Sequence, residues 1–171
     1  MFLALIKPVN GILPKIGKDC FLADNATIVG EVELGDRVNV WFQTVVRGDV
    51  NFIKIGSESN IQDGVVVHGT YRKASTIIME KVSIGHNAII HGCVVENGAL
   101  VGMGAIVMDH AVIGEGAMVA AGSVVLAGTQ VPPGMLYAGV PAKEIKPIGP
   151  ELMEMIQKTP ENYLKYASWY D

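Results

Sequence analysis

The 171-residue chain contains few charged and few aromatic residues. Charged residues make up 18% of it, and there are only four Phe, two Trp and five Tyr. The net charge is −4 and no basic tract occurs, which excludes an ordinary nucleic-acid-binding surface. The two cysteines, Cys20 and Cys93, form no pair at metal-binding spacing, so we expect free thiols in a reducing, cytoplasmic compartment.

Long apolar runs are absent as well, although half of the residues are hydrophobic and the mean hydropathy is +0.35. Gly, Asn, His or an acidic residue interrupts each apolar stretch before the ~20 residues that a membrane-spanning helix needs. The opening segment, residues 1–6, is too short for a signal peptide and lacks a basic start. We therefore expect one domain with no membrane partner, built mainly from small and branched side chains.

Aliphatic residues recur at every sixth position, in register blocks that run from Leu22 to Val131. The longest block is Val95, Val101, Val107, Ile113, Val119, Val125 and Val131, and a small residue precedes most of these by two positions. A period of six is not helical. Three hexapeptide strands make a triangular coil of about 18 residues, with the aliphatic residue inside and the small residue at the corner. Gly, Asn and Asp suit the turns, and such coils stack about 4.8 Å apart.

The register is interrupted in the first half of the chain and ends near residue 134. About three residues are inserted between Val46 and Ile55, and five between Val67 and Ile78, so 69–75 is predicted to form a short loop. Residues 1–134 are predicted to form the β-helix. The remainder, 135–171, is predicted to add an extended crossing to the same domain, followed by helical segments that cover one flank of the prism.

The helical remainder is predicted in two pieces. The first covers Pro150–Lys158, and Thr159 with Pro160 suits the N-cap and first position of a second helix. The second covers Glu161–Tyr170, whose apolar side is expected to lie along the prism.

Three histidines fall in the middle coils at related register positions. His68 and His91 each follow an inward residue and lie one coil apart, so both are expected to point outward and to stack on one face. Arg47 occupies the same column one coil earlier, whereas His86 lies around a corner on the adjacent face. Two stacked imidazoles supply half of a tetrahedral metal site, and a third ligand from an adjacent face suggests a neighbouring subunit. A lone histidine is more often a structural hydrogen-bonding residue, and only the shared register favours ligands here.

Three short motifs accompany these histidines in a fixed order. They are Arg47-Gly48-Asp49, then Asn60-Ile61-Gln62-Asp63 followed by His68, and Gly85-His86 followed by His91-Gly92. Together, and over nearly the whole chain, they resemble the gamma-class carbonic anhydrase family. The resemblance implies a left-handed parallel β-helix that assembles as a homotrimer.

The same resemblance implies the chemistry. His68, His86 and His91 would bind Zn²⁺, or Fe²⁺ or Co²⁺, with His86 donated by the neighbour. Gln62 would orient the metal-bound water or bicarbonate, and Tyr137 would lie near the site. An interface ion-pair network would comprise Arg47, Asp49 and Asp63. The alternatives for these residues stay open: the three charged residues lock the trimer only, Gln62 is a surface side chain, or Tyr137 packs beneath the C-terminal helix.

The implied reaction is reversible hydration of CO₂ to bicarbonate by metal-bound hydroxide. Fast turnover also needs a proton route, which acidic residues provide in the archaeal prototype of the family. Here Val50 follows Asp49, and the loop at 69–75 is short and basic, so slow or absent CO₂ hydration stays open. Two further alternatives are a hexapeptide acyltransferase that uses a CoA thioester and a histidine base, and a non-catalytic metal-binding trimeric scaffold.

Overall fold

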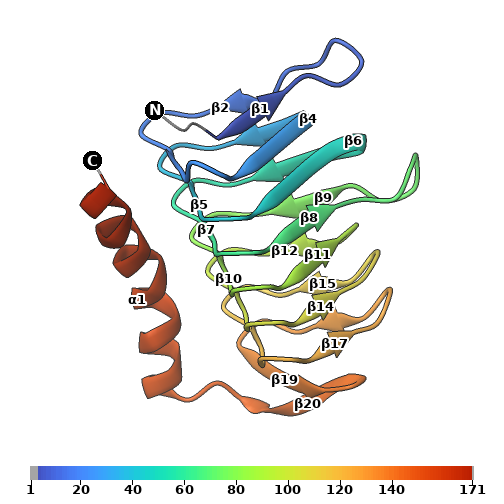
Figure 1. Cartoon of the computed structure of the whole chain (residues 1–171). Helices are drawn as coiled ribbons and strands as arrows, with labels where there is room; N and C mark the ends of the chain where they lie inside the picture. Colours follow the sequence, from blue (N-terminus) through green and yellow to red (C-terminus); the bar gives the residue numbers. More distant parts are fainter. Residues whose placement is uncertain (1–3, 171) are drawn as a thin grey trace.

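The computed structural model describes residues 4–170 as a stack of short parallel strands with one helix alongside (Figure 1). Each strand pairs with the strands one coil earlier and one coil later, so the ladders run along the stack. The long strands β4 (Thr27–Leu34) and β6 (Val45–Ile55) bend, and each contributes its two halves to two different faces. The parallel β-solenoid that the six-residue period predicts is thereby confirmed.

The strands form three faces, numbered here 1 to 3. Face 1 comprises β1 (Leu5–Lys7), the first halves of β4 and β6, β8 (Val66–His68), β11 (Ile89–His91), β14 (Ile106–Val107) and β17 (Val124–Val125). Face 2 comprises β2 (Lys15–Ile16), the second halves of β4 and β6, β9 (Thr76–Ile78), β12 (Val94–Val95), β15 (Val112–Ile113) and β18 (Gln130–Val131). Face 3 comprises β3 (Phe21–Leu22), β5 (Asn39–Val40), β7 (Asn60–Ile61), β10 (Ser83–Ile84), β13 (Leu100–Val101), β16 (Met118–Val119), β19 (Met135–Gly139) and β20 (Ala142–Pro147).

The aliphatic residues that recur at every sixth position fill the interior of the prism, as predicted. Ile84, Ile90 and Val95, one from each face, are 0% exposed. Small residues lie at the corners, and the buried ones include Ala88, Ala99, Ala105, Ala111 and Ala117. An interior of this width accepts Val, Ile and Ala but little aromatic volume, which explains the low aromatic content of the chain.

Left-handed backbone turns the corner between face 3 and face 1. Gly64 and Asn87 occupy this corner in successive coils, with φ of 70° and 58°. A β-carbon on Gly64 would lie 2.3 Å from Oδ1 of Asn87, so the glycine leaves room for the side chain one coil later. The predicted use of Gly and Asn in the turns is confirmed, because both residues adopt positive φ at low cost.

The two predicted insertions lie where face 1 turns to face 2. The pairing of β6 with β4 shifts register between Gly30 and Val32, which accommodates the extra residues of β6. Between β8 and β9 the chain leaves the prism in a short hairpin closed by an isolated bridge between Thr70 and Ala74. This loop projects from the edge of the stack (Figure 1).

The segment predicted as an extended crossing is a β-hairpin. β19 pairs in parallel with β16 and then antiparallel with β20, so the hairpin extends face 3 past the last coil. Gly139, with φ of 104°, and Pro141 lie at its turn. The sequence did not predict this reversal of the chain, because the hairpin depends on the strand edge that only the last coil provides for β19.

The predicted helix break at Thr159 and Pro160 is wrong. One helix, α1 (Pro150–Ala167), runs through both residues, and the Thr159 hydroxyl donates to the carbonyl oxygen four residues earlier. An internal proline costs about 3 kcal/mol in an isolated helix. Here Ile156, Pro160 and Ala167 form one buried stripe, so packing against the prism outweighs that local preference.

The helix lies along the prism, as predicted; it covers face 3, where it packs against β5, β7 and β10. A 3₁₀ turn, η1 (Ser168–Tyr170), extends it to the first coils of the stack (Figure 1). There the Tyr170 ring packs 5.4 Å from Phe21, 5.8 Å from Trp41 and 5.7 Å from Phe42, between ring centroids. Within residues 4–170, no helix combines the length and apolar character needed to cross a bilayer.

The register makes a testable prediction about stability. Replacing Ile113 by Ala leaves a cavity in the prism and should lower the free energy of unfolding by about 2–5 kcal/mol. Val112→Ala, in the same strand but facing outward, should cost less than about 1 kcal/mol. Equal losses for the two variants in urea unfolding would contradict the inward assignment.

Candidate metal centre

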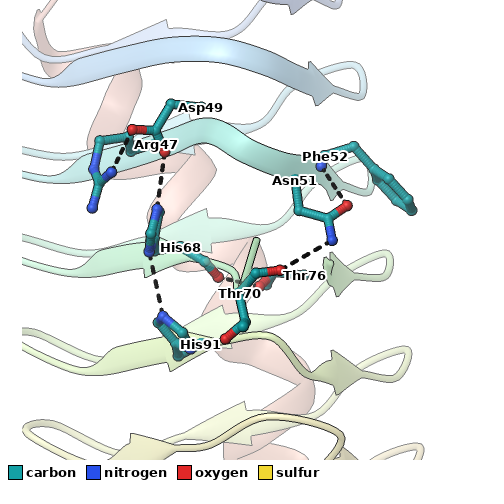
Figure 2. Close-up of polar contacts among 8 residues, drawn as sticks. All are labelled: Arg47, Asp49, Asn51, Phe52, His68, Thr70, Thr76 and His91. Carbon is teal, nitrogen blue, oxygen red and sulfur yellow. Dashed lines mark hydrogen bonds and ion pairs between the residues drawn. The ribbon is translucent and has the colours of Figure 1, made fainter. Parts of the chain in front are cut away.

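Face 1 carries an outward column of side chains that includes two histidines. The pairing of β8 with β11 places His68 directly beside His91. Arg47 of β6 occupies the same column one coil earlier (Figure 2). Each of the three follows a buried inward residue and therefore points away from the interior. The predicted stacking of His68 and His91 is confirmed.

The two imidazole rings face each other through one nitrogen each. Nδ1 of His68 lies 3.3 Å from Nε2 of His91 (Figure 2). The outer nitrogens contact carboxylates: His68 Nε2 is 2.9 Å from Asp49 Oδ1, and His91 Nδ1 is 2.6 Å from Asp109 Oδ1. Because an ionised carboxylate only accepts hydrogen bonds, the outer nitrogens carry the protons. In the neutral rings, both facing nitrogens therefore present lone pairs.

This arrangement of lone pairs fits a shared divalent cation. Nitrogen ligands lie about 2.0–2.1 Å from a tetrahedral zinc, which places two of them about 3.3 Å apart. The separation between His68 Nδ1 and His91 Nε2 is 3.3 Å. Metal-binding histidines also typically donate their other nitrogen to a carboxylate, as both rings do here. His68 and His91 therefore fit as two ligands of one metal.

The carboxylate beside His68 is held by an arginine. Arg47 Nη1 donates to Asp49 Oδ2 over 2.5 Å. Burial acts to raise the pKa of Asp49, but hydrogen bonds from His68 and Arg47, with the charge of Arg47, outweigh it and lower that pKa. Asp49 is thereby kept ionised as the acceptor for His68 Nε2. Arg47 and Asp49 form their ion pair within one chain, whereas Asp63 lies elsewhere, beside His86.

The carboxylate beside His91 is held by a threonine of the projecting loop. The Thr70 hydroxyl donates to Asp109 Oδ2, while His91 donates to Oδ1. Burial acts to raise the pKa of Asp109, and the two hydrogen bonds, together with nearby histidine charge, lower it overall. Asp109 therefore stays ionised and accepts at both oxygens.

A buried hydroxyl ties the two histidine strands together. Thr76, which is 0% exposed, donates to the carbonyl oxygen of His68 and accepts from the N–H of Gly92 over 2.9 Å. Gly92 directly follows His91, so one side chain fixes the relative position of the two strands that carry His68 and His91.

His86 lies at the corner where face 3 turns to face 1. Its Nδ1 is 2.8 Å from Asp63 Oδ2, and its Nε2 is 3.2 Å from the Tyr163 hydroxyl. The carboxylate fixes the proton on Nδ1, so Tyr163 donates to the lone pair on Nε2. Burial, and then the negative charge of Asp63, raise the pKa of Tyr163 to about 12, which keeps the phenol protonated.

Gln62 is buried behind His86, and the reading of it as a surface side chain is wrong. It is 6% exposed, and its Oε1 accepts from the backbone N–H of His86 over 3.2 Å. Its Nε2 donates to Asn60 Oδ1 over 3.0 Å, and Asn60 in turn donates to Ser83. This chain of amides fixes the corner that carries His86.

The structure does not gather all the predicted site residues in one chain. Across residues 4–170, no three His, Cys, Asp or Glu side chains converge as a metal-binding group. Tyr137 lies in β19 in register with Val119, so it occupies the inward position of the last coil and not the column of histidines. Cys93 packs in the core, where burial raises its pKa to about 12, as expected for a structural thiol.

Sequence reasoning missed Asp109, Thr70, Thr76 and Tyr163. The signal for Asp109 is the glycine after His91: a β-carbon at Gly92 would lie 2.5 Å from Asp109 Oδ1, so the carboxylate uses that space. For Tyr163 the sequence carries no such signal, because the docking of α1 on face 3 decides which side chain reaches His86.

Comparison with known proteins identifies the repeat and its relatives. The pattern described as "Bacterial transferase hexapeptide (six repeats)" matches residues 14–48 and 92–127. "Probable carbonic anhydrase" of Methanocaldococcus jannaschii is 49% identical over 152 residues, covering 89% of this chain and 95% of that protein. "Gamma carbonic anhydrase 2, mitochondrial" of Arabidopsis thaliana is 42% identical over 159 residues, covering 90% of this chain and 57% of that protein.

A solved structure matches the fold of this chain. The hexapeptide transferase family protein from Anaplasma phagocytophilum is 42% identical, with a TM-score of 0.94 over 98% of each chain. The chain therefore belongs to the gamma-carbonic-anhydrase-like family of hexapeptide-repeat proteins.

The hydrogen bonds of the two facing histidines predict opposite tautomers. In metal-stripped protein in mildly alkaline buffer, His68 should carry its proton on Nε2 and His91 on Nδ1. Long-range proton–nitrogen correlation NMR distinguishes the two forms, and His110, outside the column, gives a reference signal in the same spectrum. The same tautomer at both residues would contradict the lone-pair geometry.

Proposed function

We propose that the chain binds a divalent metal at His68 and His91 and catalyses the reversible hydration of CO₂ to bicarbonate. The observation that supports this most directly is the 3.3 Å separation of their facing nitrogens, each ring backed by a carboxylate. Zn²⁺ suits this donor set best, and Fe²⁺ or Co²⁺ also accept imidazole. When bound, such a metal supplies a water whose pKa is lowered to about 7.

The third ligand in this proposal is His86 of the partner subunit in a homotrimer. A catalytic zinc takes three protein ligands and keeps one open position. Within its own chain, His86 is oriented by Asp63 and presents Nε2 outward at a corner, capped by Tyr163. In a trimer with metal at each interface, Tyr163 would release that nitrogen and remain beside the site as a hydrogen-bond donor.

An apolar column beside the histidines supports the subunit interface. From β6 onward, the outward residues of face 1 that precede the inward register are all β-branched and follow one another in the ladder. They are Val45, Val66, Ile89, Ile106 and Val124. Val66 and Ile89 are each 38% exposed in the single chain. A continuous stripe of this kind marks a protein–protein contact surface.

The remaining site residues would bind and orient the small substrate. Gln62 fixes the backbone at His86 and, beyond its two hydrogen bonds in the chain, has one further N–H for water or bicarbonate. Arg47, Asp49 and Asp63 would form the ion-pair network at the interface. Tyr137, which lies inward in the last coil, would be farther from the metal.

The proton released in hydration has no acidic carrier at the expected places. Val50 follows Asp49, and the loop 69–75 carries Arg72 and Lys73 in place of glutamates. Slow turnover that depends on buffer as the proton acceptor therefore follows from the proposal.

A CoA-dependent acyltransferase is the second candidate, because the matched structure is described as a transferase family protein. A general base must direct a lone pair at its substrate. The lone pairs of His68 and His91 face each other, and that of His86 accepts from Tyr163. This geometry favours the metal site over a single catalytic base.

Metal content and turnover test the proposal together. The purified protein reconstituted with Zn²⁺ should hold about one metal per chain, and His91→Ala should lose the metal and the CO₂ hydration seen in stopped-flow measurements. His110→Asn, outside the site, should retain both. Metal kept by His91→Ala would refute the ligand set, while metal-independent acyl transfer from a CoA thioester would favour the second candidate.

The assembly has its own test. Ile89→Glu places a charge in the apolar column of face 1 and should convert a trimer into monomers when the mass is measured by light scattering. Ile145→Glu changes a residue that is 55% exposed on β20 and should leave the trimer intact. A trimer that survives Ile89→Glu would exclude face 1 as the interface.

A further inference from the structure

We propose that Thr70 and Asp109 act as a positioning pair that fixes the His91 ring for metal binding, an inference that rests on the metal site proposed above. Neither residue touches the facing nitrogens. Asp109 contacts only the far side of the His91 ring, and Thr70 contacts only Asp109 among the side chains of the site. The motifs that identify the family contain neither residue.

The carboxylate of Asp109 is held at both oxygens. Oδ1 accepts from His91 Nδ1 over 2.6 Å, and Oδ2 accepts from the Thr70 hydroxyl. Rotation of the carboxylate would break one of these bonds, so the hydroxyl of Thr70 sets the direction in which Oδ1 points. That direction in turn fixes both the tautomer and the orientation of the His91 ring.

The backbone around His91 leaves room for this carboxylate. Gly92 has φ of 57°, and a β-carbon there would lie 2.5 Å from Asp109 Oδ1 and 2.7 Å from Cβ of Ala74. Asp109 and the loop thus occupy the space that any larger residue after His91 would need. Asp109, one coil beyond Gly92, fits in this space because glycine leaves it empty.

Thr70 itself is fixed by the two insertions in the register. Its N–H donates to the carbonyl oxygen of Ala74 over 2.9 Å, which closes the projecting loop. Its carbonyl oxygen accepts from Asn51 Nδ2 over 3.3 Å, and Asn51 belongs to the extra residues of β6 (Figure 2). The short loop therefore serves to position a side chain and not to transfer protons: it presents the Thr70 hydroxyl to Asp109.

The two facing histidines are supported in parallel ways. On one side, Arg47 holds Asp49, which accepts from His68; on the other, Thr70 holds Asp109, which accepts from His91. Each imidazole thus has a carboxylate, and each carboxylate has a second donor. The second pair differs because its donor is neutral and comes from the loop.

Competitive Zn²⁺ titration of the metal-stripped, full-length protein against a chromophoric chelator tests the pair. Asp109→Ala should weaken the Kd for zinc by about 10- to 100-fold. Asp109→Asn should lose less, because its amide oxygen still accepts from His91. Asp24→Ala, an exposed acid with no part in the column, should bind zinc like the unaltered chain.

Combining substitutions at Thr70 and Asp109 shows whether Thr70 acts on zinc binding through Asp109 or independently of it. Thr70→Val should weaken zinc binding by a smaller factor than Asp109→Ala. Thr70→Ser, which keeps the hydroxyl, should bind zinc like the unaltered chain. The double variant Thr70→Val, Asp109→Ala should bind zinc no more weakly than Asp109→Ala alone, since Thr70 acts through the carboxylate. Additive losses in the double variant would overturn the relay.

A metal-free readout keeps the test independent of the reaction. In Asp109→Ala the Nδ1–H tautomer of His91 should be lost in NMR spectra, while His68 keeps its own and the subunit assembly is unchanged. Unaltered zinc affinity and tautomer in this variant would refute the pair. Failure of the unaltered chain to bind zinc at all would instead refute the metal site itself, so the two failures are distinguishable.

Discussion

The parallel ladder between successive coils is the constraint on which the rest of the structure depends. It places each outward side chain beside the equivalent residues of the adjacent coils, about 4.8 Å away along the stack. His68 and His91 become partners for this reason alone, since Val67 and Ile90 before them are in register in the interior. The same ladder generates the β-branched column beside them, so the proposed ligands and the proposed interface arise from one repeat.

A regular ladder cannot supply everything that a metal-binding histidine needs. Neighbours in the column lie above and below each ring, but the outer nitrogen needs an acceptor from the side. Asp49 reaches His68 from the start of the irregular part of β6, and Thr70 reaches Asp109 from the projecting loop. Both insertions in the six-residue period occur beside the two histidines: one supplies Asp49 directly to His68, and the other acts on His91 only through Asp109. The irregular segments therefore orient the two histidine rings that the regular segments align.

The sequence was sufficient for the features that the period encodes. The inward register, the loop at 69–75 and the pairing of His68 with His91 all follow from counting residues along the repeats. It was insufficient where contacts depend on how separate elements dock. The contact of Tyr163 with His86 and the continuity of α1 through Pro160 follow from packing on face 3, which no local pattern expresses. The contact of Asp109 with His91 was only partly predictable. Gly92 indicates that space is left beside His91, but the sequence does not say which side chain fills it.

The return of α1 along the prism alters how the fold should come apart. In an ordinary solenoid each coil contacts only its neighbours, so the ends can fray independently. Here the last coil leads into a helix whose end packs Tyr170 against Phe21 and Phe42 in the first coils. The chain is thus closed on itself by an aromatic clasp. Separation of the last coils from the first would have to break these aromatic contacts, so unfolding should be more cooperative than in a repeat protein without them.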